Sequence, residues 1–292
     1  MHKSYFPYAV IVPVLAFVTL FTMVPIIGSF VIAFFDYNPL RQFGNEFIGL
    51  SNFYALFDDM IFVKAFGNTL RFVIVATSLN LLITLPVAQL LCTLPSNRWR
   101  SLFRVLFFLP CVAPKAAISI VWQRSLFPIR GGLLNVALTA FGLSSINWLG
   151  NAGALMSSVI LVRLWGDIGY NLVLLVAGMQ GIPRDFYEAA EIDGAGPFRK
   201  FFQITLPLLQ RTLIFVFIMT VISQFQVFDQ FAILAPNGGV AYSGYVLSTY
   251  IYDVGFKMKN MGYASAISIV LFAIIMLTTL AQKRMMKVDW GY

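Results

Sequence analysis

The chain alternates between long apolar stretches and short polar connections. A membrane-spanning helix needs about 20 mostly apolar residues, and several stretches meet or approach that length. These stretches are 8–35, 66–94, 102–122, 155–180, 206–234 and 264–281. None shows the alternation of apolar and polar positions that a membrane β-barrel requires. The pattern therefore predicts an all-α integral membrane protein with six transmembrane helices.

The first apolar stretch is interrupted by Pro13 and Pro25. Membrane helices tolerate proline where neighbouring groups satisfy the freed carbonyl oxygens. The run of about 28 residues exceeds the roughly 7–15 residues typical of a signal-peptide core, and no clear cleavage site follows it. We therefore expect residues 8–35 to be retained as the first span.

Composition favours the same class of protein. Of the 292 residues, 59% are hydrophobic and 11% are charged, whereas a soluble domain carries about 25% charged residues. We expect a single membrane domain over residues 1–292. The net charge of +8 would suit nucleic acid or anionic lipid, but positive charge concentrated in cytoplasmic loops accounts for it equally well. Membrane lipid is therefore the expected partner of the surface, and nucleic acid is not.

Positive charges are distributed unequally between the two sides of the predicted spans. One set of connections holds ten of them: Lys3, Arg98, Arg100, Arg104, Arg184, Arg199, Lys200, Lys283, Arg284 and Lys287. The opposite set holds six: Arg41, Lys64, Arg124, Arg130, Lys257 and Lys259. Because Lys and Arg are more frequent in cytoplasmic loops, we expect both termini and the connection 181–207 to be cytoplasmic.

The sequence argues against enzymatic and metal-dependent functions. The single histidine, His2, lies at the start of the chain, which removes histidine-based catalysis and most metal sites from consideration. Cys92 and Cys111 lie in or beside apolar stretches, where they suit packing, and their spacing fits neither a disulfide framework nor a zinc site. No G-x-x-x-x-G-K-[ST] sequence occurs, so the chain has no P-loop. We expect no catalytic residue, metal or cofactor in this chain, and ATP with Mg²⁺ would be held by a separate subunit.

Residues 181–207 carry a charged segment with the pattern of two short helices. In the first, Phe186, Ala189 and Ala190 share one face at i, i+3 and i+4 spacing. Glu188 and Glu191 project to a different side of that helix. A small-residue face bordered by carboxylates could receive a partner at close range.

A break separates the two predicted helices. Gly194 supplies the permissive backbone that ends the first helix, and Pro197 begins the second. The second helix has an apolar stripe of Phe198, Phe201 and Phe202. The pattern fits either an ordinary amphipathic hairpin at the membrane interface or a docking element. In a docking element the alanines admit the partner and the aromatic side chains anchor the segment to its own helix bundle.

Ionisable residues inside spans are costly and mark functional pathways by default. Arg163 and Asp167 in the fourth span are i, i+4 neighbours and can pair along one helix face. At about 1.5 Å of rise per residue, Asp167 lies roughly 18 Å from the start of that span, near the middle of a core about 30 Å thick. The pair either locks helix packing or lines a solute site.

The fifth span carries a polar stripe. Its polar residues are Thr220, Ser223, Gln224, Gln226, Asp229 and Gln230. Thr220 and Gln224 share one face at i, i+4 spacing, which suits a hydroxyl-rich ligand. Lys115, early in the third span, is expected to extend its ammonium group toward the cytoplasmic interface rather than to line a pathway.

The segment EAAEIDGAGPFRKFFQITLPLL (188–209) resembles the EAA loop of the permease subunits of binding-protein-dependent ABC importers. The family pattern of EAA, then DGA, then I-x-LP is matched at Glu188, Ala189, Ala190, Asp193, Gly194, Ala195, Ile204, Leu206 and Pro207. The likeness extends over nearly the whole chain. Segments similar to carbohydrate-importer permeases of the maltose and glycerol-phosphate type are FIGLSNFYALF (47–57), NTLRF (68–72), FLPCVAPKAAISIVWQRSLFPIRGGLLN (108–135), NWLG (147–150), IYDVGF (251–256) and GYASAISIVLF (262–272).

The resemblance implies a role for the two-helix segment. In that family the EAA loop forms coupling helices that dock in a groove of an ATP-binding subunit. Carried over, the coupling residues here are Glu188, Ala189, Ala190, Asp193, Gly194, Ala195 and Pro207. Closure of the ATP-binding subunits would then tilt the spans and open a central site to alternate sides.

The resemblance also implies a solute pathway on the fourth and fifth spans. Positions that correspond to the solute contacts of maltose-type members are Arg163, Gly166, Asp167, Tyr170, Thr220 and Gln224, and Ser223 of the same polar stripe joins them. Several of these residue types differ from the maltose-type pattern. The solute is therefore expected to differ from maltose.

Taken with the residues, the resemblance implies the permease subunit of an ATP-driven sugar importer in a prokaryotic inner membrane, with a di- or oligosaccharide as solute. It implies three kinds of partner: a second, homologous permease, two ATP-binding subunits and an extracytoplasmic solute-binding protein. The outer segments 36–65 and 125–150 would meet the binding protein.

Two other functions compete with this expectation. An ion-coupled secondary transporter could use Arg163 and Asp167, but no inverted repeat of broken helices is evident and the EAA loop would have no role. An intramembrane enzyme would need a catalytic set, and no Ser–His, metal-ligand or paired intramembrane carboxylate set occurs. Dependence of transport on ATP or on an ion gradient separates the first two functions.

Overall fold

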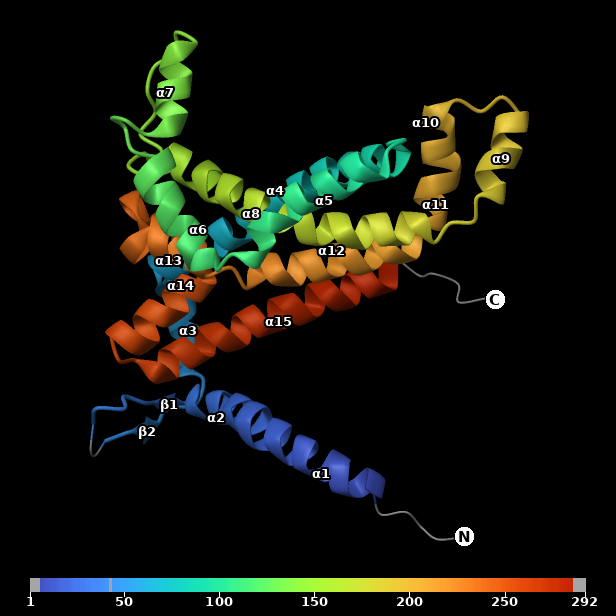
Figure 1. The fold of residues 1–292 in the computed structure, drawn as a ribbon. Helices are drawn as coiled ribbons and strands as arrows, with labels where there is room; N and C mark the ends of the chain where they lie inside the picture. The colour runs from blue at the N-terminus through green and yellow to red at the C-terminus, as the bar shows by residue number, and fades with distance from the viewer. Residues whose placement is uncertain (1–5, 42–43, 286–292) are drawn as a thin grey trace, which may run out of the picture. The chain divides into compact units, whose positions relative to one another are not determined.

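The structure is a computed structural model that describes residues 6–41 and 44–285. His2, Lys3 and Lys287, which entered the sequence argument, lie outside these residues. The chain divides into two compact units, Met1–Val63 with Tyr250–Ala273, and Lys64–Thr249 with Ile274–Tyr292. Described residues outside two short hairpin strands and the connections are helical, as the sequence predicted (Figure 1).

The first unit begins with an interrupted apolar helix. Its elements are α1 (Phe6–Val18), the π-helical turn η1 (Thr19–Met23), α2 (Val24–Ile32), β1 (Phe35–Asp36), β2 (Glu46–Phe47), α3 (Ser51–Asp58) and η6 (Asp253–Lys257). Pro25 lies in the first turn of α2, directly after the π-helical turn. A proline has no N–H to donate to the carbonyl four residues earlier, so the turn that precedes it widens.

Side chains and backbone groups join the hairpin, α3 and the start of the last helix within this unit. β1 pairs antiparallel with β2, with Phe35 opposite Phe47. Asn52, buried on α3, donates through Nδ2 to the carbonyl oxygens of Ala33 at 2.8 Å and Phe35 at 3.0 Å. The amide of Met261 donates to the carbonyl oxygen of Tyr37 at 3.0 Å. The hairpin, α3 and the start of the last helix therefore form one hydrogen-bonded assembly.

Three helices cross the division between the units: α4 (Met60–Thr93), α14 (Leu247–Tyr252) and α15 (Met261–Met285). The second unit holds the remaining elements. These are α5 (Asn97–Val112), α6 (Lys115–Val121), η2 (Trp122–Leu126), α7 (Leu133–Ala140), α8 (Ala152–Gln180), α9 (Asp185–Ile192), α10 (Pro197–Lys200), η3 (Phe201–Thr205), α11 (Leu206–Leu208), α12 (Gln210–Phe225), α13 (Asp229–Leu234), η4 (Pro236–Gly238) and η5 (Val240–Tyr242).

Helix α8 is the central helix of the second unit. Asn151 caps its N-terminus, because the Asn151 side chain accepts from the amide of Gly153 at 2.8 Å. One core cluster packs around the first half of α8 and includes Phe72, Leu155 and Phe231, all fully buried. A second cluster packs around its second half. A helix buried on most of its surface can carry polar groups only where they find partners, and α8 carries the charged residues considered below.

Five helices in the described part of the chain are long and apolar enough to cross a membrane, or up to six if one bent pair counts as a span. Four agree closely with predicted stretches: Val10–Ile32, Met60–Thr93, Ala152–Gln180 and Met261–Met285. The fifth predicted stretch, 206–234, spans a break. Its continuous helix begins at Gln210 and ends at Phe225, and α13 follows after a short non-helical segment.

The third predicted span, over 102–122, is not one continuous helix. The chain bends by 96° between Arg98–Val112 and Lys115–Leu126. The bend lies at Ala113 and Pro114, both of which have extended ψ angles. Proline sterically disfavours helical backbone at the residue before it, so the CVAP sequence ends α5 and lets α6 leave in another direction. The bend decides where Lys115, the first residue of α6, comes to lie.

Candidate functional site

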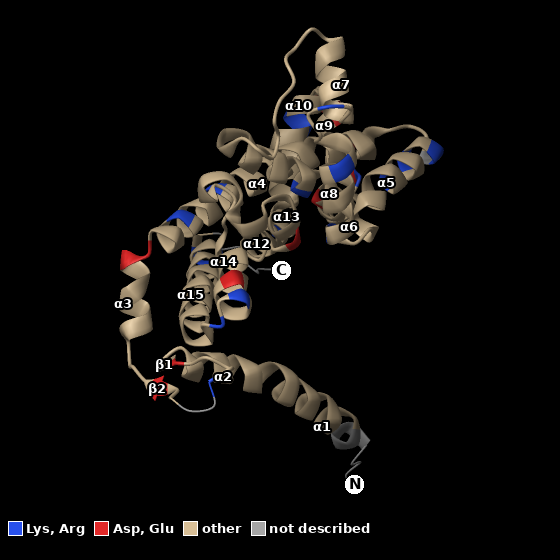
Figure 2. Cartoon of the chain, turned by 90° about the vertical axis from the view of Figure 1, so that its left-hand side faces the viewer, with Lys and Arg blue, Asp and Glu red and all other residues tan. Residues whose placement is uncertain are grey.

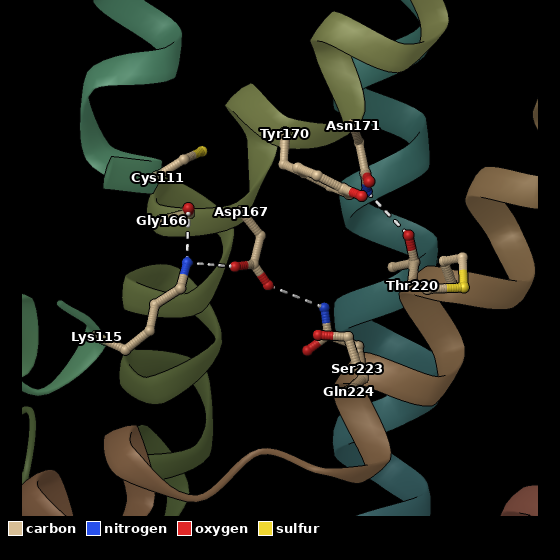
Figure 3. Close-up of a pocket in the computed structure, with 10 residues that line it drawn as sticks. Cys111, Lys115, Gly166, Asp167, Tyr170, Asn171, Thr220, Ser223 and Gln224 are labelled. Atoms are coloured by element: carbon tan, nitrogen blue, oxygen red, sulfur yellow. Dashed lines mark hydrogen bonds and ion pairs between the residues drawn. The ribbon is translucent and has the colours of Figure 1, made fainter. Parts of the chain in front are cut away.

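A polar pocket of about 320 Å³ lies within the second unit, between residues of α5, α6, α8 and α12 (Figure 3). Its lining consists of Cys111, Lys115, Gly166, Asp167, Tyr170, Asn171, Met219, Thr220, Ser223 and Gln224. Six of the seven residues expected in the solute pathway line it, and the seventh, Arg163, bonds to the lining from behind. The structure thus brings the expected set together.

Asp167 is held by two cations. Its Oδ2 is 2.6 Å from Nε of Arg163, which confirms the predicted i, i+4 pair on α8. Its Oδ1 accepts from Nζ of Lys115 at 2.7 Å, and the same ammonium donates to the carbonyl oxygen of Gly166 at 2.9 Å. Figure 3 shows Lys115 reaching across to Asp167.

The interpretation of Lys115 as a side chain directed toward the cytoplasmic interface is therefore wrong. The bend at Pro114 places the start of α6 against α8, and Lys115 turns into the pocket rather than along a straight span. Gly166 makes room for it, because a Cβ at that position would stand 3.3 Å from Nζ of Lys115. Sequence reasoning missed this contact because it places Lys115 within one span over 102–122 and does not predict the bend before it.

Arg163 joins α8 to α12. Its Nε donates to Oε1 of Gln224 at 2.9 Å, and its Nη2 donates to Oγ of Ser223 at 2.6 Å and to the Ser223 carbonyl oxygen at 3.1 Å. Only 6% of Arg163 is exposed. The guanidinium group has its charge balanced by Asp167 and its donors bound to the next helix, which meets the conditions for a buried charge.

Amide side chains extend this network beyond the predicted set. Asn171 donates through Nδ2 to Oδ1 of Asn80 at 2.6 Å and to Oγ1 of Thr220 at 2.9 Å (Figure 3 shows the second bond). All three residues are buried. A sequence signal for Asn171 exists, because Asn171 is i+4 from Asp167 and so shares its face of α8. By contrast, the predicted polar residues Gln226, Asp229 and Gln230 are not part of the described lining of this pocket.

The pocket offers charged groups, amides, hydroxyls and one aromatic ring in a surrounding of apolar spans. Tyr170, 52% exposed, presents its ring and hydroxyl at the pocket. In ligand pockets of this kind a few precisely placed polar groups fix the orientation of the ligand, and apolar surface provides most of the contact. Within the described residues no group of three or more His, Cys, Asp and Glu side chains could hold a metal ion.

The segment 181–207 forms the two helices that its sequence predicted. α9 ends in a Schellman motif: the amide of Ala195 donates to the carbonyl oxygen of Ala190 at 2.8 Å, and the amide of Gly194 donates to that of Glu191 at 3.0 Å. Gly194 has φ +71°, the left-handed conformation that glycine adopts without strain. Pro197 begins α10, and Pro207 lies in α11.

The contacts that fix this segment differ from the expected aromatic anchor. Phe198 is 83% exposed and does not anchor the segment. Instead, Oε1 of Glu191 lies 2.5 Å from Nζ of Lys200, and the hydroxyls of Tyr187 and Thr205 are 3.0 Å apart. Phe201 and Phe202 lie in the π-helical turn η3, which continues α10 directly, and Phe202 is 59% exposed as well.

The surface of the segment is open. Glu188, Ala189, Asp193 and Gly194 are exposed, and Ala190 and Ala195 are half-buried. Ile192 is 88% exposed, a large apolar side chain beside the carboxylates. Basic residues border the region: Figure 2 shows Lys and Arg on α5 and at α10.

The family comparison agrees with this geometry. The model of the family described as "Binding-protein-dependent transport system inner membrane component" matches residues 80–287. The chain is 35% identical over 283 residues to the probable ABC transporter permease protein YurN of Bacillus subtilis, covering 96% of each chain. It is 31% identical to the arabinooligosaccharides transport system permease protein AraP of Bacillus subtilis, covering 95% of this chain and 87% of AraP. It is 32% identical to the sn-glycerol-3-phosphate transport system permease protein UgpA of Yersinia pestis, covering 96% and 94%.

Solved structures show the same fold. A chain of a bacterial alginate ABC transporter, crystallised in complex with an alginate pentasaccharide-bound periplasmic protein, superposes with a TM-score of 0.86 at 21% sequence identity. The likeness covers 97% of this chain and 94% of that chain. Together with the family match over more than half of the sequence, these findings establish the class of protein. The chain belongs to the binding-protein-dependent transport system inner membrane components, the permease subunits of ABC importers.

Proposed function

We propose that this permease forms half of the translocation pathway of an importer for a di- or oligosaccharide. The observation that carries the proposal is the pocket around Asp167, in which Lys115, Ser223 and Gln224 provide hydrogen-bonding groups between apolar spans. Relatives at 30% identity or more are named as permeases for arabinooligosaccharides, diacetylchitobiose and lactose. Hydroxyl-rich solutes need many donors and acceptors, and the Tyr170 ring provides an apolar face beside them.

In this proposal the chain crosses the bacterial inner membrane six times, with the bent pair α5 and α6 counted as one span. Both termini and the segment 181–207 face the cytoplasm, and the segments 36–65 and 125–150 face the solute-binding protein. The excess of Lys and Arg in the cytoplasmic connections supports this orientation.

The same proposal assigns α9 and α10 as the coupling segment. Glu188, Ala189, Ala190, Asp193, Gly194 and Ala195 would meet the ATP-binding subunit, and Pro207 would set the start of the following span. Support comes from the exposure of Glu188, Ala189, Asp193 and Gly194 and from the break at Gly194, which separates the two short helices. A helix surface of small residues permits close approach to a partner groove, while the carboxylate of Glu188 supplies a polar contact.

The complete transporter in this proposal has a second, homologous permease, two ATP-binding subunits and an extracytoplasmic solute-binding protein. ATP and Mg²⁺ belong to the ATP-binding subunits. The alginate transporter with a similar chain was crystallised with its periplasmic protein, which supports a binding protein here.

The test is a gentle detergent purification of the tagged chain at native expression level, with every co-purifying protein identified and counted. We expect two copies of a P-loop ATPase and one further permease to co-purify. The ligand bound by the accompanying solute-binding protein then identifies the solute. A chain that purifies alone and moves solute into liposomes without ATP would overturn the proposal in favour of ion-coupled transport.

A further inference from the structure

The pocket contains more positive than negative charge. Its charged side chains are Lys115, Asp167 and, behind the lining, Arg163. The remaining lining residues are Cys111, Gly166, Tyr170, Asn171, Met219, Thr220, Ser223 and Gln224. With the thiol and the phenol protonated, none of them carries a formal charge. Two cations therefore share a single carboxylate within the membrane spans.

The two cations differ in exposure. Arg163 has 8% of its side chain exposed and directs its donors at Asp167, Ser223 and Gln224, so it is enclosed by the protein. Lys115 has 28% of its side chain exposed and lies on the pocket wall. Because Arg163 already balances Asp167, the uncompensated positive charge is located at Lys115, where a solute can reach it.

We propose that the pocket takes a solute that carries a negatively charged group, the carboxylate of an acidic sugar or the phosphate of a sugar phosphate, and that Lys115 binds this group. The inference rests on the proposed function and specifies its solute class. An uncompensated cation inside the membrane is costly, and an anionic group that enters the pocket supplies the missing charge through a charge-assisted hydrogen bond.

The geometry allows Lys115 to exchange partners. An ammonium group has three donors, and the structure uses two of them, to Gly166 and Asp167. The third is available to the solute, and Asp167 keeps Arg163 as its partner if the ammonium turns toward the solute anion. A neutral sugar could accept a hydrogen bond from Lys115 but would leave the excess charge in place.

The experiment measures ATP-dependent uptake by the complete importer in proteoliposomes, with its own binding protein present. Two matched pairs of disaccharide probes are used: digalacturonate with its dimethyl ester, and lactose 6-phosphate with lactose. In one of the two pairs, we expect uptake of the acidic probe to be about tenfold faster than uptake of the matched neutral probe. A rate ratio of this size corresponds to the loss of one charge-assisted hydrogen bond. The pair in which uptake differs identifies the anionic group of the solute as a carboxylate or a phosphate.

Variants of the pocket distinguish its contribution to the solute preference from that of the binding protein, because the same binding protein is used in every preparation. Lys115→Gln should lower the ratio of acidic to neutral uptake about tenfold, whereas Lys115→Arg, which keeps the charge, should retain the preference. Lys64→Gln removes a lysine charge at an exposed position of α4 and should leave the ratio unchanged. Co-purification of the other subunits with each variant checks that the complex still assembles.

The outcomes distinguish this inference from the function on which it rests. Equal ATP-dependent uptake of the two members of both pairs, or a Lys115→Gln variant that slows both members equally, overturns the anionic solute and leaves the sugar importer in place. Absence of ATP-dependent uptake for all four probes, in a complex whose ATPase is active, counts against the sugar-import proposal and against the inference with it.

Discussion

Gly169 on α8 lies directly against the backbone of Phe107 on α5. A Cβ atom at Gly169 would stand 2.1 Å from the carbonyl oxygen of Phe107 and 2.8 Å from Cα of Phe108. Membrane helices approach this closely only where a small residue removes the side chain from the contact. The contact brings the two helices together beside the polar pocket, whose lining includes Cys111 of α5 and Tyr170 of α8.

The first prediction follows from this contact. Gly169→Ala forces α5 away from α8, because the obstructing atoms belong to the backbone and cannot rotate aside, and we expect a loss of about 1–3 kcal/mol of stability. Thermal unfolding of the purified protein in detergent measures it. The control is Gly67→Ala, at a helical position of α4 where a Cβ would meet nothing within 4 Å. Equal melting temperatures for the two variants would contradict the close contact.

Asp167→Ala tests whether the ion pair serves packing or the solute. Arg163 keeps three hydrogen bonds to Ser223 and Gln224 in this variant, so α8 stays joined to α12. We expect the complex to assemble, and the KM for an acidic solute to fall several-fold, because no carboxylate competes for Lys115. Uptake kinetics and the yield of co-purified subunits give the two readouts. A failed assembly with an unchanged KM would show that the pair is a structural lock.

The sequence was sufficient to predict most of the helices and the pairing of Arg163 with Asp167, since apolar length and i, i+4 spacing are local properties. It was not sufficient for Lys115. Residues 102–122 are mostly apolar, with Arg104, Lys115 and Ser119 as exceptions, and the 96° bend depends on how Pro114 ends α5 within the packed unit. The bond between Asn171 and Asn80 was missed for a related reason: it joins residues 91 positions apart, a distance that no periodicity describes.

Gly194→Pro tests the coupling segment. Proline fixes φ near −65° and removes the N–H, whereas Gly194 needs φ +71° and donates to the carbonyl oxygen of Glu191. We expect the Schellman motif to be lost and ATP hydrolysis to proceed without solute uptake, while the chain remains inserted in the membrane. The matched control is Gly196→Ala, because Gly196 has φ −69° and open space at its Cβ.

A bulky residue in place of Ala189, on the exposed face of α9, also tests whether the segment 181–207 couples ATP hydrolysis to transport. Ala189→Trp leaves the backbone intact but obstructs a partner that docks on this face. Proteoliposome assays of ATPase rate and uptake should show the same uncoupling as Gly194→Pro. Wild-type uptake in both variants would remove the segment from the coupling mechanism.

Asp59 connects the start of α4 to α14 and α15 and provides a test of stability against pH. Its Oδ1 accepts from the amides of Ile61 at 2.8 Å and Phe62 at 3.1 Å, which caps the N-terminus of α4. Its Oδ2 accepts from the hydroxyls of Tyr250 and Tyr263. Burial by itself raises the pKa of Asp59, but the hydrogen bonds from Tyr250, Tyr263 and the two amides outweigh it and lower the pKa below 3.8.

A carboxyl group with a lowered pKa in the folded state stabilises the fold at pH values above its ordinary pKa, and this contribution is lost as the pH falls through the folded pKa. Asp59→Ala should therefore cost about 1–2 kcal/mol at neutral pH. The difference from wild type should shrink as the pH falls below about 3.8, the ordinary value. Asp58→Ala removes the neighbouring exposed carboxylate and serves as the control. Melting temperatures recorded across pH 2.5–7 decide the matter: a difference that stays constant over that range would mean that the charge of Asp59 does not support the fold.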